Sequence, residues 1–358
     1  WGGLTIPAAQ YHKEVYAVDK TIETLEFMKI RAKQMGLTNV FAVASSLKKL
    51  PFPDNYFDLV ILNGVLEWVA FDNDVILDKH WKGRWKNTKQ QKSPPTELQS
   101  RCLEELFRVI KPGGGIYVAI ENRIGIQYFI GHPDDHINIR FVTFLPRLIA
   151  NYITKIIRNV EYRTYIYSPT KLKELIERAG FSDTKLYGAF PHYQDISRLI
   201  PFNLMSELKS IMTSGNTIGL YGSLVKFVWK IVPASIYHYF SPSLVAIAHK
   251  ERTTEQNKLT NRIINFIKQN ILTESDLDSN RYETLILNSR FDDSNPVIYA
   301  IYDTDQKNIL YFCKVGRQKE SNNMLDYEAE QIRNAQNIFK DSVILSHIPE
   351  IVQNCEYE

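Results

Sequence analysis

The clearest structural signal in this chain is FAVASSLKKLPFPDNYFDLVILNGVLEWV, residues 41–69. It reads as one strand, a polar corner and a second strand, Phe57–Leu62, so apolar that we expect it to be buried on both faces, as in the middle of a parallel sheet. This strand ends abruptly at Asn63-Gly64, and open α/β sheets bind ligands at the ends of central strands. We therefore predict a ligand site here. The alternative is an ordinary strand end with a turn glycine.

The composition indicates a globular protein of about two domains. The chain has 358 residues, of which 44% are hydrophobic, and this length exceeds one ordinary core. Its net charge of +3 gives no reason to expect a nucleic acid partner. The three cysteines are odd in number and far apart, so neither a disulfide framework nor a Cys-x-x-Cys metal site is expected. A reducing cytoplasm is the default compartment.

The ends of the chain and its most apolar region bear on location. The chain begins with Trp1, without the charged start and apolar run of a signal peptide, so we interpret it as a fragment. Residues 218–248 are the most apolar, but charges and prolines interrupt them, and a membrane span requires roughly 20 apolar residues. We expect a core segment there. An interfacial helix at Leu220–Val232, giving peripheral membrane contact, is the alternative.

The surrounding segments predict a parallel α/β sheet. Strands are expected at Val15–Asp19 and Val40–Ala44, with an amphipathic helix between them at Thr21–Gln34. A second helix is expected at Glu97–Ile110, followed after a glycine-rich stop by a strand at Ile116–Ile120. Strands and helices that alternate at this spacing indicate βαβ units.

Four motifs occur together in the first 120 residues: the strand-ending acid Asp19, LPFPDNYFDLVIL at 50–62, VLEWV at 65–69 and RVIKPGGGIYVAI at 108–120. An acid at the tip of the first strand accepts hydrogen bonds from the two hydroxyl groups of an adenosine ribose. With these motifs in this order, roughly residues 1–250 resemble the class I S-adenosylmethionine-dependent methyltransferases. The resemblance implies an α/β, Rossmann-like methyltransferase sheet whose first strand is missing, with helical insertions at about 71–96 and 188–240.

The resemblance also implies where the cofactor, S-adenosyl-L-methionine, binds. Gly2 and Gly3 match the end of a glycine-rich loop. Asn63 and Gly64 match positions that face the methionine moiety and its methyl group. Ser46 stands where the family usually has an aspartate that binds the adenine amino group, so that contact is weakened, while Leu47 offers its backbone N–H to the ring. The implied cofactor-binding positions are Gly2, Gly3, Asp19, Ser46, Leu47, Asn63 and Gly64.

Residues 121–140, ENRIGIQYFIGHPDDHINIR, directly follow a predicted strand end. His132, Asp135 and His136 are candidate general bases for a hydroxyl acceptor, because histidine titrates near neutral pH. The alternative is a polar loop whose side chains cap backbone groups. We expect no metal here, because a proline between the two histidines opposes the helix that would present both.

The segment 71–96 exceeds what the bare fold requires. From Lys79 to Lys92 it contains six basic residues and two tryptophans, and no acid. One interpretation is a mobile lid that contacts an anionic or sugar-bearing acceptor, since tryptophan stacks on sugars and basic side chains pair with phosphate. The alternative is a solvated basic insertion.

After residue 250 the sequence changes character. Residues 251–281 read as a helix and linker, and residues 282–358 as three short strands and a helix, Met324–Phe339. Lys314 on the third strand and Glu328 on the helix resemble the N-terminal lobe of kinase-like phosphotransferases, where the lysine contacts nucleotide phosphates and the glutamate orients it. The resemblance implies ATP as a ligand of the complete domain. The alternative is a small α+β module in which the two residues occur by chance.

A methyltransferase joined to a kinase-like lobe resembles the bifunctional enzymes of cell-surface polysaccharide assembly. We therefore expect a cytoplasmic S-adenosylmethionine-dependent methyltransferase that O-methylates a glycan or phosphoglycan. One alternative is a small-molecule or quinone-type methyltransferase with an unrelated C-terminal module. The other is a catalytically inactive scaffold with the methyltransferase fold.

Overall fold

The computed structural model describes residues 1–70, 93–208, 227, 230–251, 281–288, 295–317 and 319–352. Its strands are β1 (Val15–Asp19), β2 (Val40–Ala44), β3 (Phe57–Asn63), β4 (Ile110–Glu121), β5 (Ser182–His192), β6 (Asp195–Pro201), β7 (Ser243–His249), β8 (Tyr282–Leu287), β9 (Val297–Asp303) and β10 (Asn308–Val315). Its α-helices are α1 (Thr5–Tyr11), α2 (Ile22–Gln34), α3 (Pro95–Val109), α4 (Ile126–Phe129), α5 (Arg147–Arg158), α6 (Pro169–Arg178), α9 (Ala234–Tyr237) and α11 (Lys319–Ile338). The basic insertion, the segment 220–232 and the helix and linker at 251–281 lie wholly or mostly outside the described residues.

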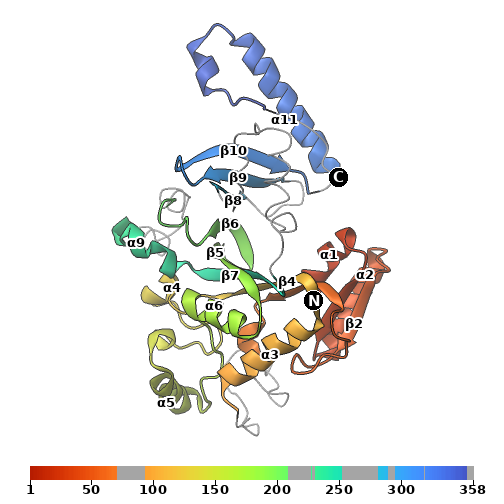
Figure 1. Ribbon diagram of the computed structural model, residues 1–358, viewed down its shortest axis with the longest axis vertical. Coiled ribbons are helices and arrows are strands. Elements are labelled where there is room, and N and C mark those ends of the chain that lie inside the picture. The colour runs from red at the N-terminus through yellow and green to blue at the C-terminus, as the bar shows by residue number, and fades with distance from the viewer. Residues whose placement is uncertain are drawn as a thin grey trace.

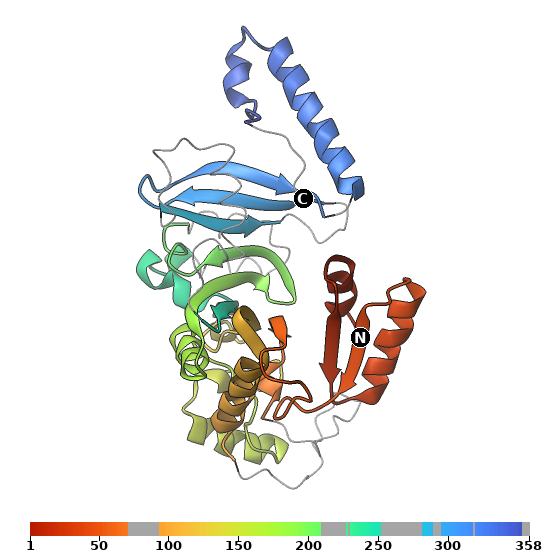
Figure 2. The ribbon, with the colours of Figure 1, turned by 45° about the vertical axis from the view of Figure 1, so that its right-hand side comes forward.

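The strands form two sheets. A mixed sheet has the order β10-β9-β8-β6-β5-β7-β4-β3, and β1 pairs only with β2, in parallel, within the described ranges. Figure 1 shows the mixed sheet at the centre of the molecule, and Figure 2 shows the β1–β2 pair standing beside it with α2 on its outer side. The architecture is α/β and Rossmann-like, with a mixed sheet and helices.

The predicted alternation of strands and helices is confirmed in the first 120 residues. β1 and β2 have the predicted bounds, and α2 and α3 occupy the predicted helical segments. β4 is longer than predicted because its glycine-rich beginning also lies in the sheet. A Cβ atom on Gly114 would lie 2.8 Å from the carbonyl oxygen of Asp58, so glycine allows this close approach to β3.

The prediction that Phe57–Leu62 is buried on both faces is wrong. β3 is the terminal strand of the mixed sheet and pairs with β4 alone among the described strands. Leu62 is buried, but the side chains of Leu59 and Ile61 are 44% and 46% exposed. An apolar run therefore marked the strand correctly, whereas its place at an edge depends on which other segments pair with it.

Aromatic side chains join the two sheets. Tyr16 of β1 stacks on Phe41 of β2 with 4.9 Å between the ring centroids. The same ring packs edge-on against Phe52, Tyr56 and Phe57, at the corner that leads into β3. The hydroxyl oxygens of Tyr16 and Tyr56 lie 2.9 Å apart. Residues 41–69 thus contribute strands to both sheets, and one aromatic cluster around Tyr16 packs these strands together.

A buried cluster on one face of the mixed sheet holds α3 and α6 against β3, β4 and β7. The cluster includes Leu62, Leu103, Leu106, Val118, Leu172, Ile176 and Ala246. The polar corner is fixed to α3 by Arg108, which donates to Asp54 (2.6 Å) and Glu105 (2.9 Å). Glu105 also accepts from the backbone of Leu50 (2.7 Å), and its bond to Arg108 keeps the pKa of Glu105 below the usual range.

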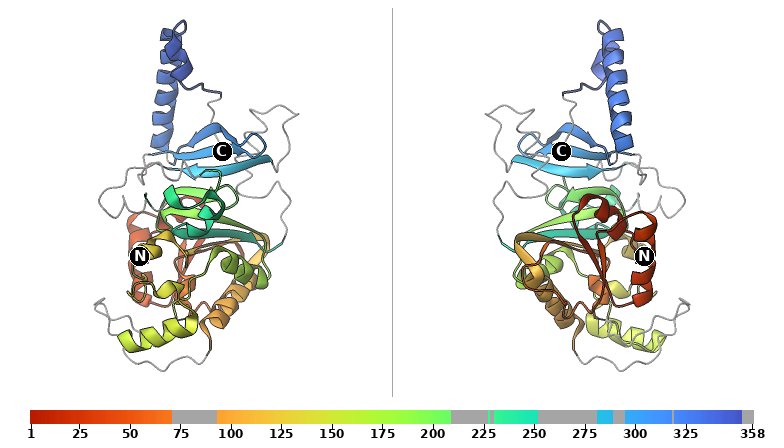
Figure 3. Two further views of the ribbon diagram at one scale, coloured as in Figure 1. Left: turned by 90° about the vertical axis from the view of Figure 1, so that its left-hand side faces the viewer. Right: turned by 90° about the vertical axis from the view of Figure 1, so that its right-hand side faces the viewer.

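The C-terminal strands continue the same sheet. β7 lies antiparallel beside β4, and β5 lies antiparallel beside β7; β5 also forms a hairpin with β6, and β6 pairs with β8. β8, β9 and β10 form an antiparallel meander, in agreement with the three strands predicted within residues 282–358, and α11 projects away from it (Figure 3). Within the described ranges, none of the helices combines the length and apolarity needed to cross a membrane.

Candidate active site

Two acidic side chains come from the carboxyl ends of neighbouring parallel strands. Asn63, the last residue of β3, lies opposite Ala119 of β4, and the Gly64 N–H donates to the Ala119 carbonyl (2.8 Å). The chain then turns through a short 3₁₀ helix, Leu66–Trp68, which presents Glu67, while β4 ends at Glu121. The side chains of Glu67 and Glu121 are only 0% and 8% exposed. Both carboxyl groups are therefore withdrawn from water.

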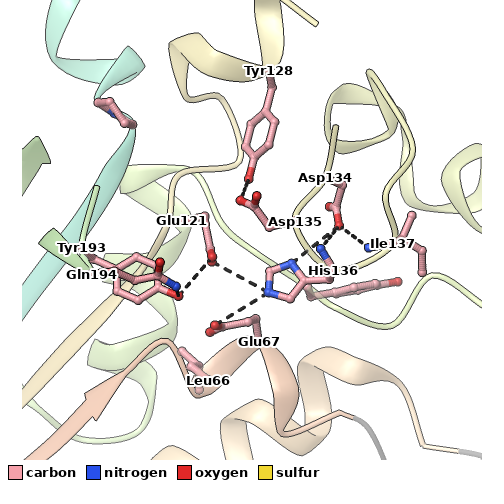
Figure 4. Close-up of polar contacts among 12 residues, drawn as sticks. Leu66, Glu67, Glu121, Tyr128, Asp134, Asp135, His136, Ile137, Tyr193 and Gln194 are labelled. Atoms are coloured by element: carbon pink, nitrogen blue, oxygen red, sulfur yellow. Dashed lines mark hydrogen bonds and ion pairs between the residues drawn. The ribbon is translucent and has the colours of Figure 1, made fainter. Parts of the chain in front are cut away.

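His136 completes a buried cluster with these two acids (Figure 4). Its Nε2 lies 3.8 Å from a Glu67 oxygen and 4.0 Å from a Glu121 oxygen. On the other side of the ring, Nδ1 lies 3.6 Å from Asp134. Asp134 is itself fixed, because it accepts hydrogen bonds from the His136 backbone N–H and from the Tyr162 hydroxyl, both at 2.9 Å. The loop therefore aims the imidazole at the two carboxyl groups.

Burial and neighbouring charges change the pKa values of the side chains in this cluster. Burial and the neighbouring charge of Glu67 raise the pKa of Glu121 to about 8, although His136 opposes the change. Burial alone lowers the pKa of His136, but Asp134, Glu67 and Glu121 together raise it to about 10. Burial alone raises the pKa of Asp134, but the contacts with His136 outweigh this effect, and the pKa lies below the usual value. Shifts of opposite sense among adjacent groups are characteristic of functional sites.

Tyr193 covers the strand end. Its hydroxyl donates to Glu121 (3.2 Å) and accepts from Gln194 (3.3 Å). Gly64 has φ +66°, and a Cβ atom there would collide with the Tyr193 ring, at 2.6 Å from Cε2. Glycine is therefore required at position 64 both by the backbone conformation and by the close approach of this ring.

The three predicted general bases separate in the structure. His136 is in the buried cluster, whereas the side chains of His132 and Asp135 are 42% and 44% exposed and lie 3.9 Å apart. Asp135 accepts a long hydrogen bond from the Tyr128 hydroxyl (3.4 Å). The structure thus brings one of the three to the ends of β3 and β4. The catalytic role of all three stays a prediction.

The predicted cofactor positions are distributed over both sheets. Gly2 and Gly3 precede α1, Asp19 ends β1 and accepts from the Thr21 N–H (2.8 Å), and Ser46 accepts from the Lys48 N–H (3.3 Å). Leu47 packs against the large core cluster. Across the described residues, neither a hydrogen bond nor an ion pair connects Asp19 with the Asn63–Gly64 turn of the mixed sheet. Cofactor binding by these residues stays a prediction.

Sequence reasoning missed Glu67 and Tyr193 as site residues, and used Glu121 only to mark a strand end. Glu67 had a usable signal, since it is the one acid in the otherwise apolar VLEWV that follows β3. Tyr193 lies in the insertion predicted at 188–240, but the sequence did not place it beside Glu121, which it reaches through the β5–β6 hairpin.

The part of the chain that contains β3 and β4 is similar to known methyltransferases. Residues 2–126, which include β3, β4, Glu67 and Glu121, match the family model described as a methyltransferase domain. Residues 2–126 are thus similar to S-adenosylmethionine-dependent methyltransferase domains, and the cofactor that this similarity supports is S-adenosylmethionine.

Curated relatives of the methyltransferase domain act in quinone biosynthesis by name. The demethylmenaquinone methyltransferase of Symbiobacterium thermophilum is 31% identical over 144 residues, which are 38% of this chain and 45% of the relative. A ubiquinone/menaquinone biosynthesis C-methyltransferase of Vibrio cholerae is 28% identical over 156 residues, 42% of this chain and 46% of the relative. The chain thus spans less than half of either relative. A solved methyltransferase from Methanosarcina mazei aligns with 70% of this chain and 89% of its own, at 15% identity and a TM-score of 0.38.

The packing of Tyr193 on Gly64 predicts a coupling between the two positions. Gly64→Ala should lower the free energy of unfolding in urea by roughly 2–4 kcal/mol, from the left-handed backbone and the collision together. In a Tyr193→Ala background the same change should cost about 1–2 kcal/mol, since only the backbone strain is left. Gly36→Ala is the matched control, because Gly36 has φ +70° and nothing lies within 4 Å of its added Cβ. Additive effects of Gly64→Ala and Tyr193→Ala would contradict this packing.

Proposed function

We propose that this protein transfers the methyl group of S-adenosylmethionine to a hydroxyl oxygen of a glycan or phosphoglycan. One observation carries the proposal: the buried cluster of Glu67, Glu121 and His136 lies at the ends of β3 and β4, beside Gly64. In the methyltransferases that this chain resembles, the position of Gly64 faces the transferred methyl. A buried polar cluster at that place suits a hydroxyl acceptor, which offers hydrogen bonds in return.

The chemistry asked of the protein is limited. The sulfonium of S-adenosylmethionine supplies an activated methyl group, so no covalent enzyme intermediate is required. The described residues have to align the acceptor, exclude water and receive the hydroxyl proton as the new C–O bond forms. In this proposal a carboxylate of the cluster accepts that proton, and Tyr193 closes the site on the side of Gly64.

A quinone-type acceptor is the second candidate for the same domain. It is favoured by the names of the curated relatives, which match the part of the chain that contains β3 and β4. Such an acceptor is methylated on a ring carbon and is largely apolar. The buried carboxyl groups favour the more polar glycan, because an apolar ring would leave most of their oxygens without partners.

We also propose that the C-terminal strands and α11 bind ATP. Lys314 of β10 forms an ion pair with Glu328 of α11. The two side chains are 39% and 44% exposed, so a ligand can reach them. A strand lysine held by a helix glutamate is the arrangement that positions nucleotide phosphates in kinase-like phosphotransferases.

We also propose peripheral contact with an anionic membrane surface, through α5. Leu148, Tyr152 and Ile156 recur at every fourth residue and are 86%, 67% and 65% exposed. Ala150 and Thr154, on the opposite side of the helix, are fully buried. The helix has three basic residues and no acid, which is the composition of helices that lie in a membrane interface.

The methyl-transfer proposal is tested with labelled S-adenosylmethionine, offered with oligosaccharides that have free terminal hydroxyls and, separately, with a naphthoquinol. Label is expected in the oligosaccharide; label in the quinol alone would favour the second candidate. Asp19→Ala should weaken cofactor binding, measured by calorimetry, about tenfold or more, because the ribose loses its acceptor. Asp58→Ala should leave binding unchanged, since Asp58 is 85% exposed near the start of β3. Unchanged affinity in Asp19→Ala would remove the assigned role of Asp19.

For the nucleotide proposal, the complete protein is treated with an amine-acylating reagent with and without ATP, and the modified lysines are read by mass spectrometry. ATP should protect Lys314, because bound phosphates cover its ammonium group. Lys307, 68% exposed at the β9–β10 turn, is the internal control and should react equally in both samples. Equal modification of Lys314 in both samples would rule out nucleotide binding at this lysine.

The membrane proposal is tested by sedimentation with vesicles of phosphatidylglycerol and phosphatidylcholine. Leu148→Asp with Ile156→Asp should lower the bound fraction at least about tenfold, since each exposed side chain contributes roughly 1.5–3 kcal/mol when buried in lipid. Ile30→Asp on α2, where Ile30 is 56% exposed, controls for the general loss of an exposed apolar residue. Binding that falls equally in both variants would argue against a specific role of α5.

A further inference from the structure

Three potential ligand atoms converge in the buried cluster. Glu67, Glu121 and His136 each offer one, and these atoms all lie within 4.8 Å of one another. They come from three different segments: the turn after β3, the end of β4 and the loop before α5. Because each segment is fixed by its own hydrogen bonds, the convergence does not depend on one mobile loop.

The carboxyl groups lack the hydrogen-bond donors that burial normally demands. Both oxygens of Glu67 and one of Glu121 have no hydrogen-bond partner among the described residues, and the Glu67 side chain is fully buried. His136, at 3.8 and 4.0 Å, is too distant to donate a hydrogen bond to either. His136 therefore offers these carboxylates a positive charge but no hydrogen bond, whereas an ion held among the three side chains would give them direct bonds.

The histidine is oriented as a ligand. The ring nitrogen that faces the carboxyl groups is Nε2, and the opposite nitrogen faces Asp134 at 3.6 Å. A carboxylate behind a histidine fixes the ring tautomer and orientation and is a common feature of metal sites. Asp134 is held in turn by Tyr162 and by the backbone N–H of Ile137.

We propose that Glu67, Glu121 and His136 bind one divalent cation of the Mg²⁺ or Mn²⁺ type. Two ligand atoms that are each about 2.1 Å from an ion lie at most about 4.2 Å apart. The separations of 3.8 and 4.0 Å therefore leave room for a single ion between His136 and each acid. Carboxylate oxygens suit magnesium and manganese, and an imidazole in the set favours manganese of the two.

The ligand set also narrows the acceptor class, in a step that rests on the proposed function. Three protein ligands leave positions free in an octahedral ion. Since the cluster lies beside Gly64, those positions are available to an acceptor with two adjacent oxygens, such as a vicinal diol of a sugar. The cation would hold one oxygen toward the methyl donor and stabilise its negative charge as its proton passes to the Glu67 oxygen that does not bind the ion.

Mn²⁺ binding to the purified protein, measured by electron paramagnetic resonance without any methyl donor or acceptor, tests the site directly. One bound Mn²⁺ per chain is expected. Glu67→Gln and Glu121→Gln should each weaken binding at least about tenfold, because each removes a charged ligand while keeping the side chain's shape. Glu104→Gln, an exposed acid on α3, is the matched control and should bind Mn²⁺ as the unaltered protein does.

A second readout protects the test against variants that fold poorly. Mn²⁺ should raise the melting temperature of the unaltered protein and of Glu104→Gln, but not of Glu67→Gln, because only a ligand of the folded state stabilises it. Absence of Mn²⁺ binding, or binding that neither Gln variant weakens, would overturn the proposal. If Mn²⁺ binds but chelation leaves methyl transfer unchanged, the acceptor step is wrong while the cation site stands. A protein that binds Mn²⁺ but methylates nothing would count against the proposed function only.

Discussion

The pairing of β4 on both sides is the constraint on which the remaining structure depends. Its last residues pair in parallel with β3 and antiparallel with β7, so their side chains must alternate between two covered faces. Ile116, Val118 and Ile120 face the core beneath α3 and α6. Glu121 follows Tyr117 and Ala119 on the other face. Once the apolar side chains are buried, the acid at the strand end is carried inside with them.

A buried carboxyl group at the end of β4 needs neighbouring groups that stabilise its charge. Glu67 arrives beside it because β3 is in register with β4, and two buried carboxyl groups in proximity repel one another when both are ionised. His136 from one loop and Tyr193 from a hairpin lie against them. The fold thus accepts an arrangement that burial alone would penalise, which is typical of sites retained for chemistry rather than for stability.

Sequence patterns predicted local structure well and spatial neighbours poorly. The strand and helix positions of the first 120 residues followed from apolar periodicity, which is a local property. The exposure of Leu59 and Ile61 could not be predicted in this way, because an apolar strand has the same sequence pattern at the edge of a sheet as at its centre. In the candidate site, too, local features were predicted and spatial neighbours were not. The loop that contains His136 was recognised by its composition, but its approach to Glu67, a residue 69 positions earlier in the chain, depends on the packing of the whole sheet.

The seam between β6 and β8 bears on how this chain can be divided. β6 and β8 are registered through only two residue pairs, Arg198 with Leu287 and Leu199 with Ile286. Behind that short ladder, however, Ile200 shares one apolar core with residues of β8 and β9 such as Tyr302. A cut near residue 250 would therefore strip β6 of its neighbour and leave an open, apolar sheet edge, the kind of surface that recruits other chains into aggregates. The piece that must remain intact for solubility is larger than the methyltransferase domain.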